Sequence, residues 1–301
     1  MPYLACFFDV TILGLKIKVT VFLSLVIRSW VMPRFLLSIF FAVVSLLLSS
    51  CAFRSDHANI VERKNVDPNK AFWRAVEKAD VIYVGETHND PAHHEYEREL
   101  IRGLLSRRNR FAVGWEMFEE PQQALLDRWQ AKKISTDELF EKTDFQKHWA
   151  VYSPVYREIL EITWKNRISN LVLNAPSTLA RKIARGEPLT DEEQRSVPVG
   201  FVSDERGFQN FAAMMGGHPG VQEADLRRFF AAQNLWDQTI ATHVLGFKQR
   251  NPKVKLVVFA GRSHVSGGYG IPFYVKQSQE LKQLVLLPRG RLDLTVDRKD
   301  I

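Results

Sequence analysis

Five short apolar runs, separated by helical patterns, constrain the fold of this chain more than any other feature. They are rich in β-branched residues, which is typical of strands buried on both faces of a sheet; the runs are 81–84, 111–115, 170–173, 255–259 and 284–287. Continuous apolar strands that alternate with helices predict an α/β fold with a mostly parallel central sheet flanked by helices. The long helical stretches at about 120–168 and 204–250 would form a helical insertion or cap subdomain.

The composition fits a globular domain and excludes several other classes. Of the 301 residues, 46% are hydrophobic and 25% are charged, which excludes a disordered or low-complexity chain. The two cysteines, Cys6 and Cys51, are too few for a disulfide-stapled mini-domain. The net charge of +7 is not gathered into a block of Lys and Arg with interleaved aromatic residues, so nucleic acid is not an expected partner.

An uncharged apolar run at 35–48 lies just before Cys51. It is short for a membrane-spanning helix, which needs about 20 residues, but it has the length of a signal-peptide core. The sequence Leu48-Ser49-Ser50-Cys51 looks like a bacterial lipobox; an ordinary secretory signal with a chance cysteine is the alternative. We therefore expect lipidation of Cys51, with acyl chains such as palmitate that hold the protein on a membrane.

The start of the chain is too long for an ordinary signal peptide, which runs roughly 15–30 residues. Met32, followed by Pro33-Arg34, would begin a signal of normal length. This interpretation divides the chain into upstream sequence, signal peptide, lipidated tether and α/β domain, at residues 1–31, 32–50, 51–70 and 71–295. Because Ala52 follows the cysteine, we expect the outer membrane of a bacterial cell envelope, with the domain facing the periplasm.

Polar side chains follow three of the five predicted strands. The turns Gly85-Glu86-Thr87-His88 and Gly261-Arg262-Ser263-His264 share a Gly-x-x-His pattern, and Glu116 follows the second run. Ligands in open α/β sheets bind beyond the carboxyl ends of the strands, so these groups could converge there. Imidazole and carboxylate suit a divalent metal such as zinc or manganese, or they could position an attacking water. For each histidine alone, hydrogen bonding within its own loop is the alternative.

Four further polar residues could support such a site. His93 and His94 lie in the first helical turn after Asp90-Pro91, where either could face the strand ends. Gln233 and Asp237 interrupt the apolar face of a helix predicted from about 222 to 247. Buried polar side chains need partners, so these two either hold a loop in place or reach the site.

Two glycine-rich loops each contain one residue able to ligate haem iron. His218 lies in the loop at 214–220, and Tyr269 lies in the loop at 266–272. Haem requires an axial ligand such as His or Tyr and apolar walls around the macrocycle. The alternative is that both loops are ordinary turns.

Four segments in order resemble the ChaN-like haem-binding lipoproteins of the Tiki/TraB/erythromycin-esterase-like superfamily. They read GETHNDPAHHEYERELI, WEMF, FFAAQNLWDQTIA and FAGRSHVSGGYGIP, at residues 85–101, 115–118, 229–241 and 259–272. The resemblance covers roughly residues 70–290. It implies an α/β core with a helical subdomain, a role in haem or iron uptake, and a homodimer around haem.

The resemblance also implies roles for particular residues. Those matching the site that binds metal or performs hydrolysis in enzymatic relatives are Glu86, His88, Glu116 and His264, accompanied by His94, Gln233 and Asp237. In one departure, Arg262 stands where relatives commonly have a small residue. It could pair with a haem propionate or with Glu116.

These observations favour a haem-binding lipoprotein over a catalyst. We expect haem near His218 and Tyr269, with a haem receptor or transporter as a further partner. The alternative is a metal-dependent esterase or peptidase that uses the two Gly-x-x-His turns and Glu116. A third interpretation is a lipid-anchored interaction protein whose ancestral site is now structural.

Overall fold

The computed structural model describes residues 5–12, 15–22, 59–63, 70–149, 153–198, 205–215 and 222–289. Two compact units are present, Met1–Asp56 and His57–Ile301. In the first, β1 (Ala5–Ile12) and β2 (Leu15–Phe22) pair as an antiparallel hairpin. Met32, the apolar run at 35–48 and Cys51 lie outside the described residues, so the start site, the signal peptide and the lipid attachment stay predictions.

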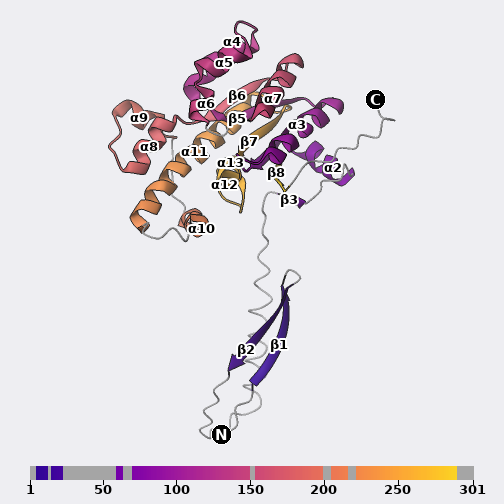
Figure 1. Ribbon diagram of the computed structural model, residues 1–301, viewed down its shortest axis with the longest axis vertical. Helices are drawn as coiled ribbons and strands as arrows, with labels where there is room; N and C mark the ends of the chain where they lie inside the picture. Colours follow the sequence, from indigo (N-terminus) through magenta and orange to yellow (C-terminus); the bar gives the residue numbers. More distant parts are fainter. Residues whose placement is uncertain are drawn as a thin grey trace. The chain divides into compact units, whose positions relative to one another are not determined.

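A six-stranded parallel sheet forms the centre of the second unit, in the order β3-β8-β4-β7-β5-β6 (Figure 1). The five predicted strands are confirmed as β4 (Val81–Glu86), β5 (Phe111–Glu119), β6 (Asn170–Asn174), β7 (Lys255–Gly261) and β8 (Gln283–Pro288). The edge strand β3 (Asn59–Arg63) lies within the segment expected to be the tether, so part of that segment belongs to the sheet. The predicted α/β class is confirmed.

Helices cover both faces of this sheet. Alternate residues of β4 point to opposite faces: Ile82 and Val84 belong to one hydrophobic core, and Val81 and Tyr83 belong to the other. The first core includes side chains of α2 (Lys70–Lys78), α3 (Pro91–Ser106), α4 (Gln123–Gln130), α5 (Thr136–Lys142), α6 (Phe145–His148) and α7 (Pro154–Lys165). The second includes side chains of α11 (Glu223–Arg250), α12 (Arg262–Val265) and α13 (Ile271–Ser278).

Side-chain caps begin two of these helices, and a 3₁₀ turn precedes a third. Asp90 and Ser153 cap α3 and α7 by accepting hydrogen bonds from backbone N–H groups, which satisfies donors that a helix end leaves free. Glu120-Pro121 instead begins a 3₁₀ turn, η1 (Glu120–Gln122), ahead of α4.

The expected helical subdomain is only partly separate from the sheet. The helices α8 (Ser177–Arg185), α9 (Asp191–Ser196) and α10 (Glu205–Met215) lie to one side of it (Figure 1). The long helix α11 contacts both α8 and β6, so part of the stretch expected to be a cap contributes to the main core. Every helix within the described part of the chain is too short or too polar to qualify as a membrane span.

Candidate functional site at the carboxyl edge of the sheet

Strand order brings the two Gly-x-x-His turns together. β7 lies between β4 and β5, so the carboxyl ends of these three strands are neighbours. A Cβ atom on Gly261 would lie 2.8 Å from Nε2 of His88 and 3.3 Å from Cδ2 of His264. Both imidazoles therefore lie against the bare backbone of Gly261, and a larger residue there would displace them.

Glu86 is the centre of the first half of the site. It is 1% exposed and has the same strand parity as Ile82 and Val84, so it points toward α3 and α7. Its Oε1 accepts hydrogen bonds from Nδ1–H of His88 and from the hydroxyl of Tyr156, both at 2.6 Å. Burial would raise the pKa of Glu86, but these donors outweigh it and lower the pKa, so Glu86 is an ionised carboxylate.

A second carboxyl group, that of Glu97, lies behind Glu86 and is fully buried. Burial, reinforced by the neighbouring charge of Glu86, raises the pKa of Glu97 well above its usual range. Glu97 is therefore protonated at neutral pH, and its neutral carboxyl group lies close to the Glu86 carboxylate. One negative charge is shared by the two acids, because two carboxylates this close cannot both ionise in a buried site.

Glu116, His264 and Asp237 form the second half of the site. Nδ1–H of His264 donates to Oδ1 of Asp237 at 2.5 Å, and Nε2 of His264 lies 3.4 Å from Oε1 of Glu116. The other oxygen of Glu116 accepts the backbone N–H of Gly261 at 2.5 Å. Asp237 comes from α11, so this half lies on the opposite face of the sheet from Glu86.

The histidines of the two halves are held in the same way. Each histidine gives its Nδ1–H to a carboxylate and turns the rest of its ring toward Gly261. Burial would lower the pKa of His264, but Glu116 and Asp237 raise it to about 9. Burial would also lower the pKa of His88, but Glu86 and Glu116 raise it. The arrangement can hold a proton on either imidazole and, after deprotonation, can present Nε2 as a base or a ligand.

The side chains at this edge are not arranged as a metal centre. Across the described residues, no group of three or more His, Cys, Asp or Glu side chains is arranged to hold a metal ion. The predicted set of Glu86, His88, Glu116 and His264 is gathered at one edge, but its histidines are held by carboxylates. Because a ligating imidazole must be neutral, metal binding would require His264 to lose its proton first.

The four supporting residues divide into two pairs. His94 and Asp237 reach the site: Nε2–H of His94 donates to the Tyr156 hydroxyl at 3.0 Å, and Asp237 holds His264. His93 and Gln233 hold loops: Nδ1 of His93 accepts the backbone N–H of Thr87, and the Gln233 amide donates to the Ser263 carbonyl. Both alternatives stated for Gln233 and Asp237 therefore occur, one for each residue.

Arg262 lies beside the site without entering it. Its guanidinium donates to the backbone carbonyl of Pro288, and Glu116 is bound by Gly261 and His264 instead. Burial lowers the pKa of Arg262, although Asp90 partly opposes this. In the described structure, the pairing of Arg262 with Glu116 that the sequence allowed is replaced by the contact with Pro288.

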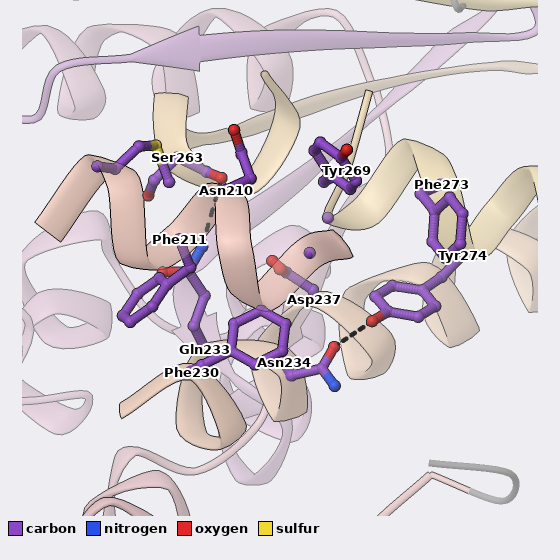
Figure 2. A pocket seen from close by; sticks show the side chains of 13 residues that line it. Asn210, Phe211, Phe230, Gln233, Asn234, Asp237, Ser263, Tyr269, Phe273 and Tyr274 are labelled. Carbon is purple, nitrogen blue, oxygen red and sulfur yellow. Dashed lines mark hydrogen bonds between the residues drawn. The ribbon is translucent and has the colours of Figure 1, made fainter. Parts of the chain in front are cut away.

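A small open hollow, with an enclosed volume of about 20 Å³, adjoins the second half of the site. Figure 2 shows that its walls combine aromatic side chains from α10, α11 and α13 with Tyr269 and Asp237; the aromatic ones are Phe211, Phe230, Phe273 and Tyr274. Asp237 therefore belongs both to the hollow and to the His264 pair. His218, the other expected haem ligand, lies outside the described residues.

Three site residues were missed by sequence reasoning. Tyr156 and Glu97 contact Glu86, and Trp149 lies edge-on to the His88 ring with centroids 4.7 Å apart. Glu97 could have been suspected, since it lies next to Tyr96 and one turn before Ile101, within the apolar face of its helix. Tyr156 and Trp149 carry no such signal.

Comparisons with known proteins agree with this architecture. Residues 72–275 match the family described as haem-binding uptake, Tiki superfamily, ChaN, while no curated protein matches the chain. The fold is similar to that of ChaN from Campylobacter jejuni with cofacially bound haem: the TM-score is 0.55 and the identity 21%, covering 72% of this chain and 84% of that one. A mutant of the erythromycin esterase EreC in its open conformation has a TM-score of 0.46 and 14% identity over 72% of this chain and 71% of that one. The chain belongs to the ChaN-like haem-binding uptake family of the Tiki superfamily.

Proposed function

We propose that this protein is a lipid-anchored haem-binding protein of the bacterial cell envelope, facing the periplasm, that holds or relays haem during iron acquisition. Membership of the haem-binding uptake family carries the haem part of this proposal. The signal-like run at 35–48 and the lipobox-like sequence ending at Cys51 support the anchor. A haem receptor or transporter would be the partner in relay.

Haem would lie across the mouth of the hollow beside the sheet, because the enclosed volume of about 20 Å³ is too small to hold the macrocycle. A macrocycle needs apolar walls, an axial ligand and an open approach. Phe211, Phe230 and Phe273 provide such walls, and Tyr269 places a phenol in the same hollow. His218 follows α10, one of the helices around the hollow, by three residues of sequence, so it is the second proposed ligand.

Exposed apolar side chains near the hollow support a homodimer around haem. The large hydrophobic side chains exposed in the described structure are Met214 at 48% and Phe229 at 41%. They belong to α10 and α11, the two helices beside the hollow, and Met214 lines it. Exposed apolar residues gathered at a ligand site are typical of a surface completed by a ligand or by a second copy.

Titration of the full chain with haem tests this proposal through the Soret band. We expect saturable binding that is lost or strongly weakened in the double variant His218→Ala, Tyr269→Phe. A matched control is Tyr83→Phe, which also removes a phenol, one that is buried and donates to Gln283. A Soret band that does not saturate, or that the double variant leaves unchanged, would contradict the proposal.

A second candidate function is a metal-dependent hydrolase. The observation that favours it is the meeting of two carboxylate-held imidazoles with Glu116 over Gly261. Nε2 of His88 and His264, with Glu86 and Glu116, would hold zinc or manganese, and a carboxylate would act as general base. Elemental analysis combined with an esterase and peptidase screen separates the two functions. Stoichiometric metal with turnover that is lost in His264→Ala would favour the hydrolase.

A further inference from the structure

The opposite, amino-terminal edge of the sheet has an unusual set of helix ends. Three helices, α3, α4 and α7, run back from the carboxyl edge and end beside the starts of β5 and β6. Each ends in the same hydrogen-bonded turn, in which the residue after the cap has a left-handed backbone. Those residues are Arg108 (φ 54°), Lys132 (φ 59°) and Arg167 (φ 56°).

A cation is not the residue that such a turn prefers. Glycine adopts positive φ without steric penalty and is usual at this position. The equivalent turn after α8 does use glycine, Gly186 at φ 70°. Four non-glycine residues in the described part of the chain have positive φ. Three are the cations at this edge, and the fourth is Asp144. Attraction to the helix dipole favours a cation near any helix end, but it does not require the left-handed position.

The same edge carries further cations that are free of ion pairs. Arg107, Arg110, Lys133 and Lys165 are exposed and, like the three left-handed cations, form no ion pair with the described residues. An open hollow of about 320 Å³ lies at this edge, and its lining includes Lys132, Trp164, Arg167 and Ile168. Lys132 lies over the Trp164 ring, 4.5 Å from its centroid. Cations beside a half-buried aromatic ring are typical of surfaces that meet lipid headgroups.

The chain that follows the expected lipid attachment enters the domain at this same edge. β3 runs parallel to β8, and its first residue, Asn59, pairs with Leu284 near the start of β8. Cys51 precedes Asn59 by eight residues, a length of chain that spans at most about 29 Å. From β3 to β6 the sheet has five strand spacings, or about 24 Å.

We propose that this amino-terminal edge is a docking surface for anionic phospholipid headgroups. The surface is defined by Arg107, Arg108, Arg110, Lys132, Lys133, Lys165 and Arg167. The inference rests on the proposed lipid anchor at Cys51. Together, the anchor at the β3 end and the cations at the β5 and β6 end would hold the strands with their carboxyl ends pointing away from the membrane. The haem hollow and the two Gly-x-x-His turns would then face the periplasm.

The test uses the full acylated chain in vesicles of phosphatidylcholine alone or with phosphatidylglycerol, followed by hydrogen exchange. We expect amide exchange in the turns at 106–110, 131–133 and 165–169 to be at least about fivefold slower with phosphatidylglycerol, and 0.5 M salt to abolish the difference. Exchange in the carboxyl-edge turn at 87–90 should not change. The triple variant Arg108→Gly, Lys132→Gly, Arg167→Gly should lose the slowing, because each cation close to an anionic surface strengthens docking roughly fivefold.

The glycine variant keeps the test independent of folding, since glycine suits all three left-handed positions. Its thermal midpoint should stay unchanged or rise. The matched control, Arg181→Gln, Arg185→Gln, Arg195→Gln, removes the same charge from exposed positions on α8 and α9 and should keep the slowing.

The outcomes separate this inference from the proposed function. The proposed docking surface alone is overturned if the acylated chain exchanges its amides equally fast in both vesicle types. It is also overturned if the slowing of exchange persists in the glycine variant. A Cys51 peptide that carries no lipid by mass spectrometry overturns the proposed function instead. The same holds if, without vesicles, the double variant His218→Ala, Tyr269→Phe binds haem as well as the wild type does.

Discussion

The buried pair of His264 and Asp237 should make the stability of the domain depend on pH. His264 is 6% exposed, and Asp237 is 3% exposed. Burial would lower the pKa of His264, yet the carboxylates of Glu116 and Asp237 raise it from 6.5 to about 9. The folded state therefore binds this proton more tightly than the unfolded chain does.

The sign and size of the effect follow from these two pKa values. Because the folded pKa is the higher one, the stabilisation is fully present below pH 6.5 and is lost as the pH rises toward 9. A separation of about 2.5 pH units corresponds to about 3 kcal/mol in the free energy of unfolding. This is a large share of the 5–15 kcal/mol that stabilises a typical domain.

Urea unfolding of the chain between pH 6 and pH 9.5, with a chelator present, measures the loss. We expect the free energy of unfolding of the wild type to fall by about 3 kcal/mol relative to that of His264→Gln across this range. The control His243→Gln removes a half-exposed imidazole 2.8 Å from Glu120. It should keep the wild-type slope, since exposed ion pairs contribute little. Parallel curves for the wild type and His264→Gln would refute the reasoning.

Three further substitutions test the packing of the first half of the site by urea unfolding. Gly261→Ala keeps an allowed backbone (φ −57°) but places its Cβ 2.8 Å from His88. We therefore expect the free energy of unfolding to fall by about 1–3 kcal/mol. An unchanged urea midpoint would mean that His88 moves freely. Tyr156→Phe removes a donor to the buried Glu86 and should cost about 1–3 kcal/mol. Glu97→Gln keeps a neutral donor beside Glu86 and should cost less than about 1 kcal/mol. A larger loss for Glu97→Gln than for Tyr156→Phe would show that Glu97 is ionised.

The sheet could be predicted from sequence because parallel strands buried on both faces are continuously apolar. The five runs that meet this condition all became strands. β3 reads Asn-Ile-Val-Glu-Arg, which has no continuous apolar run. Its place at the edge of the sheet depends on pairing with β8, more than two hundred residues later in the chain, and no local pattern encodes a contact of that kind.

The site was predictable to the extent that it lies on strand ends. Gly-x-x-His turns and Glu116 come from β4, β5 and β7, whose order at one edge follows from the fold. The helical contributors depend on the rotation of each helix about its axis. His93 and His94 are adjacent in sequence, and only the position of Tyr156 on α7 determines that His94 reaches Glu86. The partners Tyr156 and Glu86 are 70 residues apart.

Strand alternation explains why the site is built as two halves. Glu86 follows the parity of Ile82 and Val84 toward α3 and α7, while Glu116 follows the parity of Ala112 toward α11. Side chains on opposite faces of a sheet cannot normally meet. They approach here only because both histidines lie beyond the last paired residues, around Gly261, which has no side chain to separate them. The glycine is therefore the element that joins two separately buried acid–imidazole pairs into one site.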